Sequence, residues 1–215
     1  MPRGRARSTQ RSDSEETRQA ILKAAQDLFM ERGYRAVTTR MVADASGVKQ
    51  PLLYYHFADK EALYLEVQRK QAMSCRVALE RIAARKHESI PERLCHVMRY
   101  LRRSHQQNMG MLFHELKHEL TPATRVAMSE LFRTCIVAPI LSIFEDGIRV
   151  GFLQPSDEGG VAPRLATYLL LNAASNLPED GQNNGAASVW WEEGHDPVVE
   201  VVNALIYGMA TRLPV

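Results

Sequence analysis

Apolar residues recur at helical spacing along most of the chain, and no stretch alternates convincingly with a period of two. The first helix is expected to begin near Ser12–Ser14, where Ser12 and Glu15 have the spacing of a capping box, and to end at Gly33. Its apolar face contains Ile21, Leu22, Ala25, Leu28 and Phe29. The pattern therefore predicts a scaffold helix at the start of an all-α fold.

Further helices are predicted from the same periodicity and from the prolines that precede apolar stretches. A long helix is expected from Lys60 to about Lys86, with Asp59 as its N-cap. Pro139 is expected to kink or interrupt the helix that contains it. The chain should then hold about nine helices, the later ones near residues 91–107, 109–119, 122–150, 160–176 and 196–212.

After the first helix, residues 38–65 indicate two short helices around a tight turn, followed by the start of the long helix. Thr38 or Thr39 can cap the first of them, and Gly47 supplies a residue that is free to turn. Pro51 suits the first turn of the second, where a missing N–H costs nothing. This second helix, Gln50–Phe57, carries aromatic and imidazole side chains that contribute little to a small core. Such side chains suit the phosphates and base edges of duplex DNA.

These features resemble the DNA-binding domain of the TetR/AcrR family of bacterial regulators. The resemblance covers roughly residues 15–70, and its most specific part is Gly-Val-x5-Tyr-Tyr-His-Phe-x2-Lys-Glu-x-Leu. It implies a basic flexible arm at 1–14, a three-helix helix-turn-helix domain at 15–60 with its motif at 38–57, and a helical effector-binding and dimerisation domain at 61–215. The matching residues are Ala24, Ala25, Leu28, Phe29, Gly33, Tyr34, Thr38, Thr39, Ala43, Gly47, Val48, Leu53, Tyr54, Tyr55, His56, Phe57, Lys60, Glu61 and Leu63.

The resemblance also implies which residues meet DNA. Thr39, Tyr54, His56 and Lys60 correspond to phosphate contacts, and a leading edge formed by residues 49–51 and Tyr55 enters the major groove. The whole set is Thr38, Thr39, Arg40, Lys49, Gln50, Pro51, Tyr54, Tyr55, His56 and Lys60.

Two positions of this set depart from the family pattern, which often has Ser at position 49 and Gly or Ala at position 51. Lys49 makes the surface more cationic and could add a guanine contact, whereas Pro51 removes an N–H. Tyr55 and Phe57 could instead be partly core, and Leu53 is expected to be core. The operator sequence cannot be copied from a relative with these substitutions.

Charge distribution agrees with a DNA-binding N-terminal part, although the net charge is only +2. Residues 1–60 carry 11 Lys and Arg against 7 Asp and Glu, and the remainder carries 16 against 18. The first twelve residues contain four arginines and no acid. They could be a solvated tail, an arm that lies along DNA, or each at different times.

Dimerisation through the two C-terminal helices is implied by the resemblance; the alternative is that these apolar faces only complete the monomer's own core. The expected interface residues are Leu165, Tyr168, Leu169, Asn172, Val198, Val202, Leu205 and Met209. Between the two helices, Pro178–His195 is a long polar segment, expected to be functional or mobile.

A small-molecule effector is the second implied partner. Met-rich and aromatic positions of the middle helices suit an adaptable apolar pocket, and they point to an apolar or amphipathic ligand. The expected lining is Met98, Leu101, Met109, Leu112, Phe113, His114, Phe132, Ile136 and Phe144, with Glu115 or Arg133 as possible further polar contacts.

Two alternatives to an effector-controlled regulator remain. The first is a DNA-binding regulator without a small-molecule effector. The second is a metal-dependent hydrolase, because His114-Glu115-Leu116-Lys117-His118 matches H-E-x-x-H on a predicted helix. No third-ligand motif follows, and no strands are predicted to form a peptidase cleft. We therefore expect no enzyme activity, no bound metal and no cofactor.

Bulk composition is that of a soluble globular protein, with 45% hydrophobic and 24% charged residues. No apolar run approaches the roughly 20 residues of a membrane span, and the basic N-terminus lacks the apolar part of a secretory signal. Three widely separated cysteines argue against a disulfide framework. The sequence therefore predicts a cytoplasmic homodimeric regulator that acts as a repressor. Its expected partners are double-stranded operator DNA, a second copy of itself and a small effector, but no membrane.

Overall fold

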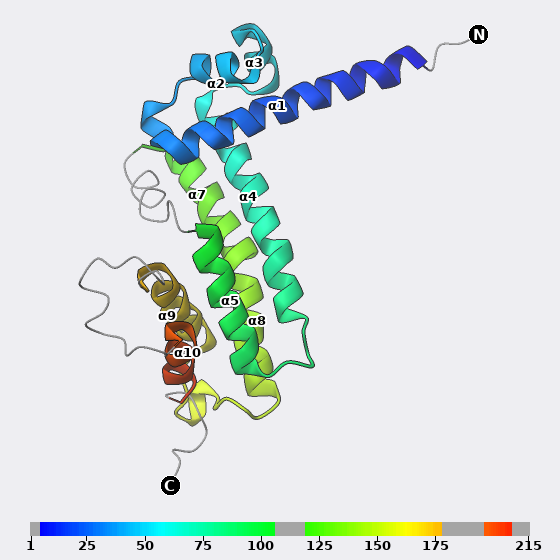
Figure 1. The fold of residues 1–215 in the computed structure, drawn as a ribbon. Coiled ribbons are helices and arrows are strands. Elements are labelled where there is room, and N and C mark those ends of the chain that lie inside the picture. Colours follow the sequence, from blue (N-terminus) through cyan, green and yellow to red (C-terminus); the bar gives the residue numbers. More distant parts are fainter. Residues whose placement is uncertain (1–4, 106–118, 178–195, 208–215) are drawn as a thin grey trace. The chain divides into compact units, whose positions relative to one another are not determined.

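A computed structural model describes the backbone of residues 5–105, 119–177 and 196–207, and the side chains of 13–103, 119–177 and 196–207 (Figure 1). Within these ranges the secondary structure is helical, with no β-strand, which confirms the predicted all-α class. The chain forms two compact units, Met1–Met73 with Gly110–Leu131 and Ser74–Met109 with Phe132–Val215. The start of the long helix therefore belongs with the helix-turn-helix, beyond the boundary predicted at residue 60.

The first unit contains α1 (Arg5–Ala36), α2 (Thr39–Ser46), α3 (Gln50–His56) and the beginning of α4 (Lys60–Ala83). Helix α1 packs against both α2 and α3, so it is the scaffold that the sequence predicted. The core of this unit is formed by apolar side chains from every one of these helices and from the segment before α7 (Pro122–Phe132), a helix that lies mostly in the same unit. Its buried residues are Ile21, Leu22, Ala25, Phe29, Val37, Val42, Ala43, Leu53, Phe57, Leu63, Tyr64, Val67 and Leu120.

Helix α1 begins at Arg5, so the prediction that it begins near Ser12–Ser14 after a flexible arm is wrong for residues 5–12. No residue from 5 to 32 is Gly or Pro, and nothing in the sequence stops the helix from extending backwards. Gly33 does break the helical path, with φ 74° and ψ 166°. Glycine takes this conformation without the steric cost that a side chain would add.

The second unit contains α5 (Ile90–His105), α8 (Ala138–Arg149), α9 (Pro163–Asn176) and α10 (Pro197–Tyr207), with the last turns of α4. Helix α5 packs against the other three, which makes it the centre of this unit (Figure 1). A short 3₁₀ turn, Ser156–Glu158, lies between α8 and α9. Buried side chains include Leu94, Val97, Met98, Leu101, Ile136, Ile140, Ile143, Phe144, Ala166, Leu170, Val198, Val202 and Ile206.

The helix predicted at 122–150 is instead three consecutive segments. Helix α7 (Pro122–Phe132) passes into a π-helical turn, Arg133–Val137, and then into α8. The Ala138 N–H donates to the Arg133 carbonyl five residues earlier. Pro139 has no N–H and its ring crowds the carbonyl four residues before it, so the wider turn relieves the crowding without ending the helix. The interruption expected at Pro139 thus takes the form of a π turn just before it.

The run Pro122–Arg149 is long and apolar enough to cross a membrane by length and composition, although the sequence was expected to contain no such run. Core helices of soluble proteins pass the same test. Ile140, Ile143 and Phe144 in this run are almost completely buried in the second unit. These three side chains pack into the core of the second unit, while about a third of the apolar stretch as a whole is buried.

Candidate nucleic-acid interface

The turn between α2 and α3 is fixed by local hydrogen bonds. The Thr38 hydroxyl accepts the Met41 N–H at 3.2 Å and caps the start of α2. Gly47 ends α2 with φ 70°, and the next N–H, from Val48, donates to the Ala43 carbonyl at 3.0 Å. These caps satisfy backbone groups that both helix ends would otherwise leave open. They fix where α3 starts.

Helix α3 is anchored by its apolar side and exposes the other. Leu53 is fully buried and Phe57, its C-cap, is 5% exposed, whereas Tyr54 is 47% and Tyr55 is 78% exposed. Burial of Leu53 agrees with its expected role in the core. Tyr55 is the most exposed aromatic of the helix, so the alternative that Tyr55 is partly core is wrong. For Phe57, which is buried, that alternative is correct.

The predicted DNA-contacting residues lie close together on α2, α3 and the first turn of α4. Thr38, Arg40, Lys49 and Pro51 are exposed, as are the two tyrosines. The rest, Thr39, Gln50, His56 and Lys60, are half-buried. The set therefore combines cationic, amide and hydroxyl groups on one helix-turn-helix, which is the chemistry that phosphates and base edges require.

A hydrogen-bonded group of three side chains joins α2 to α3. The Thr39 hydroxyl lies 3.0 Å from the Tyr54 hydroxyl and accepts the Gln50 amide Nε2 at 3.2 Å. Gln50 and Tyr54 are four residues apart and so lie on the same face of α3. The hydroxyl oxygen of Thr39 thus holds both Gln50, which is expected to contact bases, and Tyr54, which is expected to contact phosphate.

Lys60 begins α4 directly after its N-cap. The Asp59 carboxylate accepts the Ala62 N–H at 2.7 Å, which confirms the predicted cap. The Lys60 ammonium lies 4.1 Å from the centre of the Tyr34 ring, within the range of a cation–π contact. Tyr34 matched the family motif, but its contact with Lys60 could not be inferred from sequence because the two residues are distant along the chain.

Two further sets of contacts in this unit were not predicted from the sequence. Arg18 on α1 lies over the ring of Phe57 at 5.4 Å and forms an ion pair with Glu66 at 2.8 Å. Glu61 accepts both the N–H and the hydroxyl of Thr121, at 2.8 and 2.7 Å, just before α7 begins. Both contacts join segments far apart in sequence, and they fix the positions of α3 and α4.

Comparison with known proteins assigns a family to the helix-turn-helix part of the chain. The family model for bacterial regulatory proteins of the tetR family matches residues 21–67, which span the helix-turn-helix and the first turns of α4. This part of the chain therefore matches the DNA-binding domain of the TetR family. FasR of Mycolicibacterium smegmatis, named as an HTH-type transcriptional activator, is 42% identical over 66 residues, or 31% of this chain and 30% of FasR.

A second relative and a solved structure extend the comparison. AcnR of Corynebacterium diphtheriae, named as an HTH-type transcriptional repressor, is 32% identical over 118 residues, or 54% of this chain and 50% of AcnR. The chain therefore spans half or less of the length of these two relatives. The structure of Salmonella enterica GusR has a TM-score of 0.67 at 19% identity and covers 92% of this chain and 96% of GusR. That similarity shows the fold.

The expected effector-binding residues lie partly in the core of the second unit. Met98 and Leu101 on α5, Ile136 in the π turn and Phe144 on α8 are all buried there, and Phe132 is half-buried. Met109, Leu112, Phe113 and His114 lie outside the described residues.

The expected dimer residues divide into two groups. On α9, Leu165, Tyr168 and Leu169 are 50%, 61% and 42% exposed, and Asn172 is exposed on the same side. On α10, Val198 and Val202 are buried inside this chain, because α10 packs against α5 and α9. Their assignment to a dimer interface is therefore wrong, and for them the alternative of a core role holds. Leu205 is half-buried, and Met209 lies outside the described residues.

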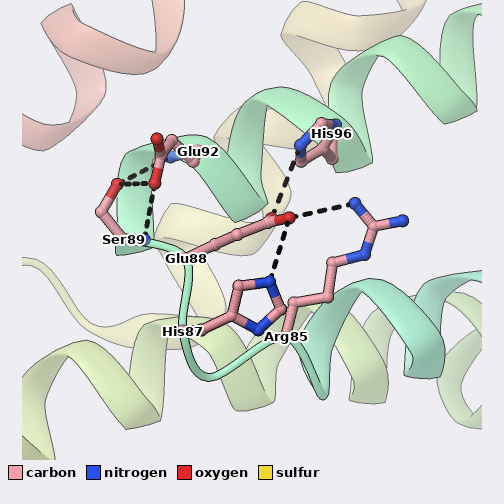
Figure 2. Close-up of polar contacts among 6 residues, drawn as sticks. All are labelled: Arg85, His87, Glu88, Ser89, Glu92 and His96. Carbon is pink, nitrogen blue, oxygen red and sulfur yellow. Dashed lines mark hydrogen bonds and ion pairs between the residues drawn. The ribbon is translucent and has the colours of Figure 1, made fainter.

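A separate polar cluster surrounds Glu88 in the turn between α4 and α5 (Figure 2). The Glu88 carboxylate lies 3.2 Å from Arg85, 3.5 Å from His96 and 3.9 Å from His87. Beside it, the Ser89 N–H and hydroxyl both donate to Glu92 at 2.7 Å, which caps α5. Across the described ranges no group of three or more His, Cys, Asp or Glu residues could hold a metal ion. The cluster is thus an ion-pair network that fixes this turn.

Proposed function

We propose that this protein is a homodimeric cytoplasmic repressor that binds operator DNA through α3 and is released from it by a small apolar or amphipathic molecule. The observation that carries DNA binding is the arrangement of α3. Its apolar side is fixed in the core by Leu53 and Phe57, and Lys49, Pro51 and two tyrosines are exposed beside Thr39 on α2. A helix N-terminus with neighbouring cationic and hydroxyl groups suits phosphate, and Gln50 suits adenine.

Selection from a pool of random DNA duplexes tests this proposal, because the operator is not known. The wild-type protein should enrich a sequence with two related half-sites, since a symmetric dimer presents two copies of α3. Tyr54→Phe should then weaken binding to the enriched duplex by about 30-fold at fixed salt, because a hydrogen bond of about 1 kcal/mol is lost at each of the two half-sites. Equal affinity of this variant and the wild type, measured by fluorescence anisotropy, would contradict the role of Tyr54.

Dimerisation is supported by the apolar stripe that α9 exposes. Leu165, Tyr168, Leu169 and Asn172 follow the i, i+3, i+4, i+7 spacing that places residues on one face of a helix. Large exposed apolar side chains in such a row mark interaction surfaces. A second copy of the same face would cover them.

Control by an effector is supported by the adaptable Met, Leu and Phe side chains in the core of the second unit. A small molecule that binds one state better than another shifts the equilibrium between them, with a typical coupling of about 1–3 kcal/mol. Apolar and amphipathic compounds that raise the melting temperature should therefore also lower DNA affinity, by about 5- to 150-fold. A regulator without an effector is favoured if no compound that binds changes DNA affinity.

The direction of regulation follows from the position of the operator relative to a promoter. FasR is named as an activator and AcnR as a repressor, so the family name alone does not decide it. A reporter gene behind the enriched duplex should be expressed less when this protein is present. The hydrolase alternative gains no support from the comparisons, and His114, Glu115 and His118 lie outside the described residues.

A further inference from the structure

Thr39 holds a position that a phosphate contact alone does not explain. Its neighbour Thr38, not Thr39, caps α2 through its hydroxyl. The Thr39 hydroxyl therefore has no role in starting the helix, and it is engaged by two side chains of α3 instead. Its surroundings suggest a function in arranging those side chains.

The hydroxyl of a threonine can donate one hydrogen bond and accept two. The Gln50 Nε2 donates to Thr39 Oγ1 and occupies one acceptor position. Either hydroxyl can donate in the 3.0 Å contact between Thr39 and Tyr54. Tyr54 is the more exposed of the two, so a chain in which Thr39 donates to Tyr54 leaves the Tyr54 O–H directed outward. The two hydroxyls then offer one outward donor between them.

The Gln50 amide keeps one hydrogen-bond donor and one acceptor that its bond to Thr39 does not use. One of its two N–H bonds goes to Thr39, so one N–H and the carbonyl oxygen stay available. A glutamine that reads adenine uses this same pair, with its oxygen accepting from N6 and its remaining N–H donating to N7. The bond to Thr39 fixes the orientation of the amide without using the groups that reading requires.

We propose that Thr39 is the positioning residue that sets the base preference of Gln50 and couples it to the phosphate contact of Tyr54. The hydrogen bonds run from Gln50 through Thr39 to Tyr54, and a phosphate oxygen accepts the last one. Consecutive hydrogen bonds strengthen one another, so engagement of the phosphate tightens the hold on the amide. Thr39 then contributes to sequence selectivity without touching DNA. This role rests on the proposed DNA-binding function and differs from the direct phosphate contact that the family resemblance implies.

The test compares base preference, which a direct phosphate contact would not alter. The probes are the duplex enriched by the wild-type protein and its single base-pair substitutions, titrated by fluorescence anisotropy at one salt concentration. Thr39→Val removes the hydroxyl and keeps the shape, Thr39→Ser keeps the hydroxyl, and Gln50→Ala removes the reading amide. Thermal melting followed by circular dichroism checks each fold, and Thr39→Ala is a second variant without the hydroxyl should Thr39→Val melt early.

Thr39→Val and Gln50→Ala should flatten the preference at the same position of each half-site, lowering the ratio of affinities there at least about fivefold. Thr39→Ser should keep that ratio. The proposal is overturned if Thr39→Val weakens binding to every duplex by one common factor with the ratio unchanged, or if Thr39→Ser loses the ratio as Thr39→Val does. If the wild-type protein enriches no sequence at all, the proposed DNA-binding function itself fails, which is a distinguishable result.

Discussion

Among single residues, the two adjacent leucines of α3 differ in role: one anchors the helix in the core and the other is exposed to solvent. Leu53 is fully buried, whereas Leu52 is 40% exposed. Leu53→Ala should lower the free energy of unfolding by about 2–5 kcal/mol, because it leaves a cavity in the core that holds α3. Leu52→Ala is the matched control and should change it by about 0.5 kcal/mol or less. Urea unfolding measures both, and similar losses for the two variants would contradict the orientation of α3.

Lys60 is a residue whose expected contribution to DNA binding is purely electrostatic. Neutralising one phosphate releases counterions, so each such contact adds about 0.9 to the slope of log affinity against log salt. Lys60→Gln should therefore reduce this slope by about 2 for a dimer on two half-sites. The ratio of affinities between base-substituted duplexes should stay unchanged. A salt titration of the variant that parallels the wild-type curve would show that Lys60 remains on the Tyr34 ring when DNA is bound.

For helices, the features predictable from sequence are those set by a few neighbouring residues. Thr38, Gly47, Pro51 and Asp59 each act on backbone groups within four positions, so the bounds of α2, α3 and the start of α4 follow from them. The start of α1 is predicted too late because Ser12 and Glu15 have the spacing of a capping box, yet no Gly or Pro stops the helix from continuing back to Arg5.

Other features of the helices depend on packing between segments distant in sequence. The π turn before Pro139 shifts the residues of α8 by one position around the helix, and only the surrounding core decides where that shift occurs. The burial of Val198 and Val202 likewise depends on which neighbours α10 meets. The hydrogen bonds from Gln50 to Thr39 and from Thr121 to Glu61 join residues 11 and 60 positions apart. Periodicity shows that a face is apolar, but it does not specify what covers the face.

The hydrogen bonds from Thr121, the residue before α7, to Glu61 make the stability of the first unit depend on pH. Burial raises the pKa of Glu61, but hydrogen bonds from Thr124 and Thr121 together lower the pKa by more, so it lies below the ordinary value of 4.5. A carboxylate whose pKa is lowered in the folded state stabilises that state fully above the unfolded-state value. This contribution is lost as the pH falls from 4.5 through the lower folded-state pKa.

Glu61→Gln isolates this contribution, since the amide oxygen can still accept a hydrogen bond but carries no charge. At pH 7 the variant should be less stable by about 0.5–1 kcal/mol, a small value because the carboxylate is partly exposed. The difference from the wild type should shrink at pH 3.5, because this pH lies below the ordinary pKa of 4.5 and the unfolded state therefore binds more protons there. Urea unfolding at both pH values measures it. A difference that stays constant between them would show that the charge of Glu61 does not support α7.

At the scale of the whole molecule, symmetric DNA binding requires two copies, and the exposed stripe of α9 is the surface available for pairing. Leu165→Glu places a carboxylate where Leu165 is 50% exposed in the single chain and would be buried against its copy. Two unpaired charges in an apolar interface cost several kcal/mol, so the dimer should dissociate. Light scattering after gel filtration should then give the 24.3 kDa of one chain instead of twice that mass.

Loss of the dimer should also weaken binding to the two-half-site duplex by at least about 100-fold, because the second α3 no longer binds as part of the same molecule. Affinity for a single half-site should be nearly unchanged, since α3 and its core are untouched. Val126→Glu is the matched control, because Val126 on α7 is 71% exposed and lies outside the stripe. It should remain dimeric and bind the full duplex like the wild type. If Leu165→Glu also remains dimeric, a different surface joins the two copies.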